Sequence, residues 1–521
     1  MPENGNPRSA TVTQSPPSAY AGLCELMRGA GTLASIGHLL NWDQETYMPP
    51  AGAEARSEQQ ATIAALVHER RTDPRVGELL DECERDPAIR GEGTDSARAR
   101  NLVEMRRDYE LATKLPTELV RELARTTSVS QEAWKQARAK SDFASFAPHL
   151  EKVLALTRRK AECLGVPEGG ELYDPLLDEY EPGMTARQVD AIFTPLRARL
   201  SGLVGAIKGS GRGASRDEVR KSIPGAQQTA FCMDVLKAIG FDLRAGRLDV
   251  TTHPFCSGLA PGDTRLTFRY ETESFLEPLY GVLHEAGHGM YEQGLPKDRH
   301  FGEPLGDSVS LGIHESQSRM WENFVGRSRS FWTWALPLAR KALAPHLDDW
   351  NLERLYAAAN IVAPSFIRIE ADEATYNLHI MLRFELERAL VSGDLAVRDL
   401  PGTWNRKFKE YLGLDVPDDR RGCLQDVHWS FGLVGYFPTY TLGNLYAAQL
   451  WERINRDLPG LNGDMSRGEF GALKTWLNTN IHAHGRRYRA EELCARATGA
   501  PLSADPLLRH LEAKLKPIYG L

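Results

Sequence analysis

The sequence lacks long apolar runs, and this absence excludes membrane-spanning helices. No stretch of the 521-residue chain approaches the roughly 20 apolar residues needed to cross a bilayer. The N-terminal stretch MPENGNPRSATVTQSPPSAY also has no apolar segment behind a basic start, so no secretory signal is indicated. We therefore expect a cytoplasmic protein that has no membrane partner.

Cysteine is scarce, and clusters of basic residues are missing. The seven cysteines are odd in number and show no CxxC spacing, which indicates neither a disulfide framework nor a thiolate zinc site. The formal net charge of -7 is small for this length, and no block of lysine and arginine occurs. We expect reduced thiols and no nucleic-acid partner.

Composition divides the chain into a short polar tail and a long globular part. Residues 1–18 are rich in Pro, Ser, Asn and Thr without an apolar period, which predicts a disordered tail. Residues 19–521 contain no clear linker and no internal repeat, so we predict a single domain. From Ala19 to about residue 200, apolar residues recur at spacings of three and four, which predicts successive helices.

One short region departs from the helical pattern. The segments GRLDVTTHPF and TRLTFRY show alternating and β-branched residues around a Pro-Gly-Asp turn at 261–263, which predicts a small β-sheet. The earlier Gly-rich stretch GSGRGASRD, at 209–217, is either a phosphate-binding loop or a mobile surface loop. The surface loop is favoured, because no strand pattern precedes the stretch and no GK[ST] closes it. The predicted fold class is mainly α.

The segment LYGVLHEAGHGMYEQGL contains the pattern His-Glu-x-x-His. Residues four apart lie about one turn apart on the same helix face, so His284 and His288 can reach one tetrahedral ion. The apolar residues of the segment gather on the opposite side, so the histidines point away from the helix's own apolar face. Gly294 and Pro296 predict the end of this helix.

A catalytic zinc site with two histidines needs a third protein ligand and an open position. The segment SVSLGIHESQSRMWENF predicts a further helix, on which Glu315 lies opposite the apolar stripe. The two helices can pack antiparallel, and His284, His288 and Glu315 then form a His2Glu site. The alternative is that all three are ordinary surface residues. Glu285, beside His284, is positioned to take a proton from a metal-activated water.

Six short motifs follow one another in order: HPF (253–255), DTRLT (263–267), HEAGH (284–288), HESQ (314–317), IRIEAD (367–372) and GCLQDVHW (422–429). In these motifs the chain resembles the carboxypeptidase Taq family of metallocarboxypeptidases. The resemblance implies a large, mainly α, zincin-like fold with the small sheet next to the active-site helix and a deep central cleft. It also implies His284, His288 and Glu315 as metal ligands and Glu285 as the general base.

The function implied by this resemblance is the release of single residues from peptide C-termini, with broad specificity and poor cleavage next to proline. Zinc, sometimes replaced by cobalt, is the implied cofactor, with one ion per chain. Peptides with a free C-terminus are the implied partners, and a homodimer is the implied assembly. Two alternatives stay open: a metallo-oligopeptidase that cuts within short peptides, and a non-catalytic helical scaffold.

Two arginines are candidates for binding the terminal carboxylate of a peptide, because a planar guanidinium pairs with a carboxylate through two hydrogen bonds. Arg368 in IRIEAD is the first choice and Arg265 in DTRLT the second. The alternative for each is a structural salt bridge, with Asp372 or Asp263 close by in sequence. His253, held extended before a proline, either lines the substrate groove or stabilises the adjacent turn.

A tetrahedral intermediate needs a hydrogen-bond donor for its oxyanion. His428, Tyr436 and Tyr440 resemble the histidine and tyrosine that serve this role in related helical zinc peptidases. Each is alternatively a packed aromatic with a satisfied polar tip, and the sequence does not choose between the tyrosines. His314 either supports a metal ligand or is structural, and the structural role is favoured. The Gln-Asp pair at 425–426 is interpreted as a support that orients ligands.

Overall fold

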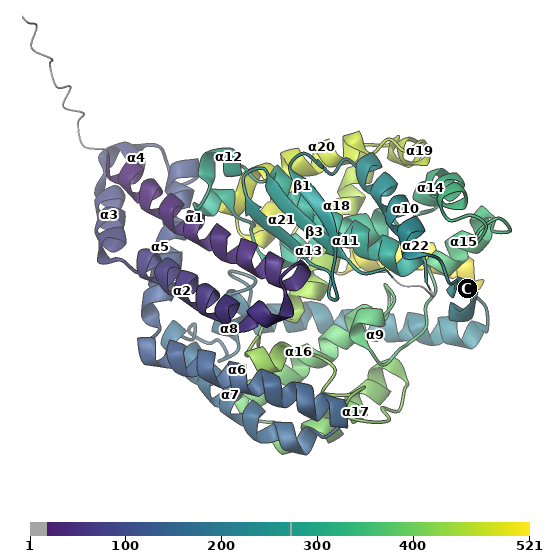
Figure 1. The fold of residues 1–521 in the computed structure, drawn as a ribbon, viewed down its shortest axis with the longest axis horizontal. Coiled ribbons are helices and arrows are strands. Elements are labelled where there is room, and N and C mark those ends of the chain that lie inside the picture. Colours follow the sequence, from purple (N-terminus) through teal and green to yellow (C-terminus); the bar gives the residue numbers. More distant parts are fainter. Residues whose placement is uncertain (1–17, 271–273) are drawn as a thin grey trace, which may run out of the picture.

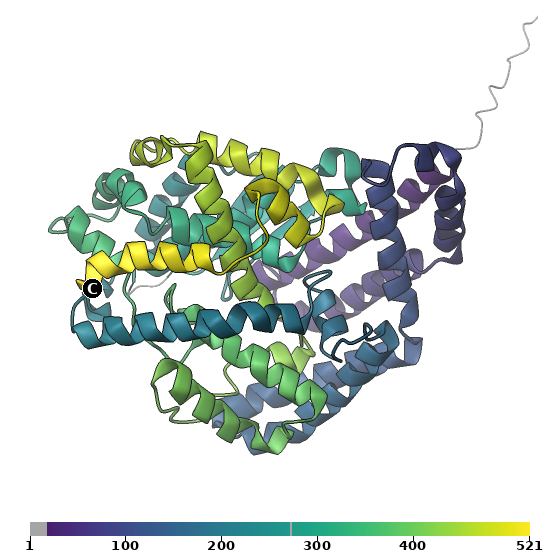
Figure 2. The same ribbon diagram turned by 180° about the vertical axis from the view of Figure 1, so that it is seen from behind.

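The computed structural model describes residues 18–270 and 274–521, and most of these residues are helical (Figures 1 and 2). The predicted fold class is confirmed: helices surround a small sheet that lies next to the HEAGH helix. The deep central cleft and the single domain at 19–521 stay predictions. The predicted tail lies outside the described residues except for Ser18, whose hydroxyl caps the first helix.

The first half of the chain is almost wholly helical, as its apolar spacing predicts, and the first helix begins at Ala19. The helices are α1 (Ala19–Thr46), α2 (Ala53–Arg71), α3 (Pro74–Arg85), α4 (Pro87–Gly91), α5 (Ala97–Lys114), α6 (Thr117–Lys140), α7 (Phe143–Leu164), α8 (Asp174–Asp178), α9 (Ala186–Ser210) and α10 (Gly225–Ala238). A helix, not a strand, therefore precedes the Gly-rich stretch, as the surface-loop interpretation requires.

The second half resumes with the HEAGH helix. Its helices are α11 (Leu276–Gly294), α12 (Lys297–His300), α13 (Leu311–Arg319), α14 (Arg329–Ala342), α15 (Leu352–Ala359), α16 (Tyr376–Ser392), α17 (Leu400–Leu412), α18 (Pro438–Asp457), α19 (Leu461–Ser466), α20 (Gly471–Asn480), α21 (Ala490–Thr498) and α22 (Asp505–Tyr519). No helix among the described residues has both the length and the apolar composition that a bilayer crossing requires.

The sheet consists of β1 (Gly246–Val250), β2 (Cys256–Ala260) and β3 (Asp263–Phe268), in the order β1-β3-β2. β1 runs parallel to β3, and β2 pairs with β3 antiparallel through the predicted turn, where Gly262 adopts a φ of +77°. β1 and β3 were predicted, whereas β2 was not. Its sequence CSGLA has few of the β-branched and aromatic residues that favour strands, so pairing with β3 determines its conformation.

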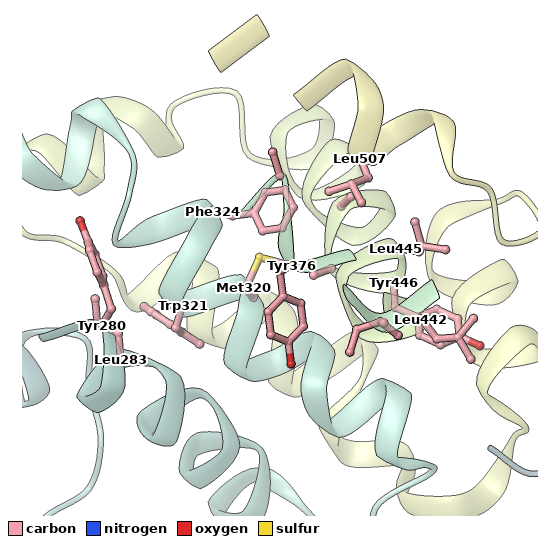
Figure 3. Close-up of a cluster of buried hydrophobic side chains, with 14 of the residues drawn as sticks. Tyr280, Leu283, Met320, Trp321, Phe324, Tyr376, Leu442, Leu445, Tyr446 and Leu507 are labelled. Carbon is pink, nitrogen blue, oxygen red and sulfur yellow. The ribbon is translucent and has the colours of Figure 1, made fainter. Parts of the chain in front are cut away.

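Two hydrophobic cores stabilise the described part of the chain. A small one is built around α1, α3 and α5, at the purple and blue end of the molecule (Figure 1). The large one includes α11, α13 and most of the C-terminal helices. Figure 3 shows part of it, where Met320, Trp321 and Phe324 pack between residues of α11 and α18. The elements that carry the candidate site belong to this large core.

The helix predicted from SVSLGIHESQSRMWENF changes its winding part-way. α13 ends at Arg319, and a π-helical turn continues from Met320 to Val325. Such turns insert an extra residue into a helix and are frequent at functional sites. The change of winding could not be predicted, because the apolar spacing fits an uninterrupted α-helix.

The HEAGH helix ends at Gly294 as predicted, and both of its sides face other elements. α11 is buried on both faces, and even Tyr280 and Tyr291, which lie beside the histidines, are 5% and 0% exposed. The reason is that α13 covers the second face. The side of the helix that carries the histidines keeps some exposure, at 21% for the His284 side chain and 17% for His288, and Glu277 near the helix start is exposed.

Candidate metal centre and active site

α11 and α13 approach each other at the centre of the HEAGH motif. A Cβ atom at Gly287 would lie 2.3 Å from the carbonyl oxygen of Gln317, so only glycine allows this contact. The helices run antiparallel, as predicted. The middle of α11 lies beside the turn after α13, and the C-terminal part of α11 lies beside the N-terminal part of α13. His284 thus lies beside Glu322, and Glu292 lies beside His314.

This packing brings the three predicted metal ligands together. The Nε2 atoms of His284 and His288 lie 3.5 Å and 3.4 Å from the same oxygen, Oε2 of Glu315. One ligand atom from each residue lies within 4.8 Å of the other two. Two imidazole nitrogens and one carboxylate oxygen at such spacing form a donor set that suits a zinc-type ion with an open position. The residues present therefore fit a divalent metal.

The outer nitrogen of His284 is held by a carboxylate. Its Nδ1 lies 2.9 Å from Oε2 of Glu322, which leaves Nε2 facing Glu315. Glu322 also accepts hydrogen bonds from Arg319 at 3.1 Å and from Arg327 at 3.3 Å. Burial alone would raise the pKa of Glu322, but Arg319 and His284 lower it to about 2. Glu322 is thus a fixed negative charge that orients the His284 ring.

Glu315 is oriented by its own helix. Its carboxylate accepts hydrogen bonds from Nε of Arg319 at 2.7 Å and from Oγ of Ser318 at 2.9 Å. Burial opposes its negative charge, but Arg319 and His284 hold the pKa of Glu315 well below its usual range. α18 makes room for the side chain, because a Cβ at Gly443 would lie 2.6 Å from Cβ of Glu315.

His288 has a different outer contact, which is a second imidazole. Its Nδ1 lies 2.5 Å from Nδ1 of His314, and Nε2 of His314 lies 2.9 Å from Oε1 of Glu292. The ammonium of Lys297 binds the other oxygen of Glu292. The structure thus places His314 against a predicted ligand, which favours the ligand-supporting role over the structural role that the sequence favoured.

Glu285 is buried beside the triad, with 6% of its surface exposed. No hydrogen bond to its carboxylate occurs among the described residues. Burial is the main reason that the pKa of Glu285 is raised to about 7. A carboxylate in this state can both accept and release a proton near neutral pH.

A second charged cluster surrounds the predicted substrate arginine. Arg368, in a 3-10 turn at Arg368–Glu370, donates from Nε and Nη2 to Oδ1 of Asp426, at 3.0 Å and 2.9 Å. Arg383 of α16 donates from Nε to the other oxygen of Asp426 at 2.7 Å. Nη1 of Arg368 donates to the hydroxyl of Tyr376 at 3.0 Å. The salt bridge considered for Arg368 is therefore made with Asp426 and not with Asp372.

The predicted oxyanion donors lie next to this cluster. Nε2 of His428 is 3.3 Å from the hydroxyl of Tyr440, whose ring centroid lies 4.9 Å from the Arg368 guanidinium carbon. The Tyr436 ring packs on both His428 and Tyr440, with centroids 5.4 Å apart in each case. Burial, then the charge of Glu315, raises the pKa of Tyr436. The donors therefore lie next to the arginine cluster, and the charge of Glu315 still affects Tyr436.

Two predicted residues are not brought into contact with the others among the described residues. Arg265 pairs with Asp263 at 2.9 Å, and its guanidinium carbon lies 4.2 Å from the ring centroid of Trp42 on α1. This pair is the salt-bridge alternative for Arg265. His253 is exposed on the loop between β1 and β2. Their substrate roles stay predictions.

Sequence reasoning missed residues that connect the two clusters. The ring of Tyr376 lies under the guanidinium of Arg319, 4.3 Å from its carbon, while its hydroxyl accepts from Arg368. In Figure 3 this hydroxyl points away from the apolar side chains around Met320. Arg383 and Tyr376 lie on α16, which has no charged or motif pattern that would single them out. Glu322 is seven residues after Glu315, a helical spacing that could have indicated it.

Comparisons with known proteins decide the family. A family model described as "Carboxypeptidase Taq (M32) metallopeptidase" matches residues 22–515. The chain belongs to this M32 family. The thermostable carboxypeptidase 1 of Thermus thermophilus is 47% identical over 512 residues, which cover 97% of the M32 chain described here and 100% of that protein. The resemblance inferred from the six motifs is thus confirmed.

Solved structures agree with this membership of the M32 family. The M32 carboxypeptidase from Deinococcus radiodurans R1 is similar with a TM-score of 0.93 and 41% identity, over 97% of this chain and 100% of that one. A Pyrococcus furiosus carboxypeptidase is similar with a TM-score of 0.91 and 36% identity, over 96% of this chain and 99% of that one. The predicted enzyme class, a metallocarboxypeptidase, is confirmed at the level of the family.

Proposed function

We propose that this M32 chain removes single residues from the free C-termini of peptides, with zinc, or cobalt in its place, bound by His284, His288 and Glu315. Glu285 is the proposed general base, and Arg368 binds the terminal carboxylate. Broad side-chain specificity, poor cleavage next to proline, a cytoplasmic location and a homodimer belong to the proposal through the family resemblance alone.

The observation that carries the proposal is an excess of buried positive charge. Arg368 and Arg383 are 5% and 0% exposed, and they share the single carboxylate of Asp426. A buried charge without a partner is costly, so such a site is stabilised by an added anion. The terminal carboxylate of a peptide supplies that anion, and a guanidinium binds it with directed hydrogen bonds.

A divalent ion held by the triad, when bound, supplies Lewis acidity toward the scissile carbonyl and makes water acidic. The protein's own part in proton transfer falls to Glu285. Because no described residue donates a hydrogen bond to it, its carboxylate is available to water, and its pKa of about 7 suits proton transfer at neutral pH. In the proposal Glu285 takes the proton of the attacking water and gives it to the leaving amine.

His428 and the two tyrosines are the proposed donors for the developing oxyanion. We assign the direct role to Tyr436, whose ring packs on His428 and whose pKa is raised by burial and then by the charge of Glu315. Tyr440 lies against His428 and Arg368, so its proposed role is to position them. Tyr436→Phe and Tyr440→Phe separate the two roles, since the first is expected to lower kcat more.

His253 and Arg265 form the outer part of the proposal. His253 precedes β2, whose Cys256 thiol has its pKa raised by burial and then by the carboxylates of Glu292 and Glu285. β2 therefore runs close to the general base, which supports His253 as a residue of the substrate groove. For Arg265 the contacts with Asp263 and Trp42 favour an anchoring role over direct substrate binding.

The test is a timed digestion of a defined peptide followed by mass spectrometry, with metal analysis of the same preparation. The proposal expects about one divalent ion per chain and stepwise loss of single C-terminal residues. Internal fragments would instead identify an oligopeptidase. Protein that binds no metal and cleaves nothing after addition of zinc or cobalt would indicate the scaffold alternative.

A further inference from the structure

The two histidines of the metal triad have unlike outer partners. His284 contacts the carboxylate of Glu322 directly, whereas His288 reaches a carboxylate only through the imidazole of His314. Metal-binding histidines commonly donate the proton of their outer nitrogen to a carboxylate, a carbonyl or water, which fixes the tautomer of the ring. For His288 this task falls to His314 and to the residues behind it.

We propose that His314, Glu292 and Lys297 form a relay that holds His288 in the tautomer whose Nε2 lone pair faces the metal position. The inference rests on the proposed metal site and deepens it, since it names positioning residues that do not contact the ion. None of the three is a metal ligand or a catalytic residue in the proposal above.

The hydrogen-bond directions in the relay are set by Glu292, which lies at its outer end beside Lys297. Glu292 accepts from Lys297 and, at Oε1, faces Nε2 of His314 at 2.9 Å. The ammonium of Lys297 contacts Glu292 directly, and a carboxylate paired in this way only accepts hydrogen bonds. Nε2 of His314 must therefore carry the proton.

The same logic fixes the next ring. When His314 carries a single proton, on Nε2, its Nδ1 has a lone pair and lies 2.5 Å from Nδ1 of His288. Nδ1 of His288 then carries the proton and donates it, and Nε2 keeps its lone pair toward Glu315. The reverse assignment would place two lone pairs, those of His314 and Glu292, against each other and would protonate the ligand atom of His288.

The fold holds this relay in place from several sides. His288 and Glu292 lie four residues apart on α11 and so share one face with His284. The ring of Tyr291 packs on His314, with centroids 5.2 Å apart, and its hydroxyl accepts a hydrogen bond from the amide of Val309. Glu292 and Lys297 also line a cavity of about 310 Å³.

The chain offers a conservative replacement that isolates the hydrogen bonds. A glutamine at 314 can accept from His288 through its carbonyl oxygen and donate to Glu292 through its amide nitrogen, whereas a leucine can do neither. His482 supplies the matched control. It is also buried, its ring lies 5.1 Å from Tyr291, and it has no contact with the triad among the described residues.

The experiment measures zinc affinity of the metal-free protein by competition with a chromogenic chelator, and the visible spectrum of the cobalt-loaded protein. For His314→Leu we expect roughly 10–100-fold weaker zinc binding and an altered cobalt spectrum. For His314→Gln we expect an affinity within about threefold of wild type and an unchanged spectrum. His482→Leu is expected to lower the Tm without changing zinc affinity.

Two results would overturn the relay: a His314→Leu protein that binds zinc as tightly as wild type, or a His314→Gln protein as weak as His314→Leu. Wild-type protein that binds no divalent ion would refute the metal site as well, so the two failures are distinguishable. If His314→Leu does not fold, Glu292→Leu and Glu292→Gln test the relay from its other end. The leucine is then expected to weaken zinc binding about tenfold, and equal affinity of both variants would refute the relay.

Discussion

The metal centre and the arginine cluster are built with opposite charge. Around the triad the carboxylates of Glu285, Glu315 and Glu322 outnumber the guanidinium groups of Arg319 and Arg327. In the second cluster two arginines share one aspartate. The first region therefore attracts a cation and the second an anion. A peptide C-terminus requires both, a polarised carbonyl and a paired carboxylate, within one residue of each other.

The largest expected effect comes from replacing Glu285, the proposed general base beside the metal centre. Glu285→Gln removes the proposed proton acceptor but none of the proposed ligands, so kcat/KM should fall by about 10²–10⁴-fold while bound metal stays near one ion per chain. Hydrolysis rates and metal content of one preparation check this. A variant that keeps its metal and cleaves at the wild-type rate would refute the role of Glu285.

The next largest effect comes from replacing Arg368 in the arginine cluster. Arg368→Met should lower kcat/KM for a peptide acid by roughly 10²–10³-fold, because a directed charged contact to the carboxylate is lost. The same peptide with a C-terminal amide should be cleaved about equally by variant and wild type. Arg265→Gln is the matched control, since this arginine also pairs with an aspartate. If Arg265→Gln shows the loss of preference for the peptide acid that is expected of Arg368→Met, the roles assigned to the two arginines would be reversed.

A third change tests how Asp426 stabilises the arginine cluster. Burial opposes the charge of Asp426, but Arg368 and Arg383 outweigh it and lower the pKa of this carboxyl. An acid with a depressed folded-state pKa stabilises the fold above its unfolded value of about 3.9, and this contribution is lost as the pH falls through the folded value. Asp426→Asn should cost about 3–5 kcal/mol at pH 7.

The measurement for Asp426→Asn is the difference in thermal midpoint between variant and wild type across pH. The difference should be largest at neutral pH and should shrink as the pH falls below about 4. A difference that stays constant across this range would show that the charge of Asp426 does not stabilise the cluster.

The smallest effect concerns helix packing behind the triad. Gly287→Ala places a methyl group 2.3 Å from the carbonyl oxygen of Gln317, and relief of this clash should cost about 1–3 kcal/mol and weaken metal binding. Gly281, on the same helix, has open space around its Cβ position, so Gly281→Ala should be neutral or slightly stabilising. Equal effects of the two substitutions on Tm would contradict the close contact of α11 with α13.

The same contrast decides what the sequence could predict. The metal centre could be predicted from helical periodicity. His284 and His288 share a helix face because they are four residues apart, and Glu315 could be found from its predicted helix. The arginine cluster is built from separate segments that only folding brings together. No pattern in the sequence therefore pointed to Arg383 and Tyr376. Glu292 followed the same spacing as the two histidines, but its role depended on His314, which only the packing of α13 on α11 reveals.

Tertiary packing also explains where local rules failed. α11 has one apolar face by periodicity, yet Tyr280 and Tyr291 on its other side are also buried, because α13 and the turn after it pack there. β2 is a strand although its small residues do not favour one, because it pairs with β3. Arg368 pairs with Asp426, far along the chain, although Asp372 is only four residues away, and no spacing rule predicts such a long-range pair.

The proposed site holds a cation at the metal centre and the terminal carboxylate of the same peptide at the arginine cluster. The most direct measurement is the ratio of kcat/KM for a short peptide acid to that for its C-terminal amide, with metal-loaded wild-type protein. Two separate charged halves predict a preference for the acid of roughly 10²-fold or more. Equal rates for acid and amide would contradict the claim.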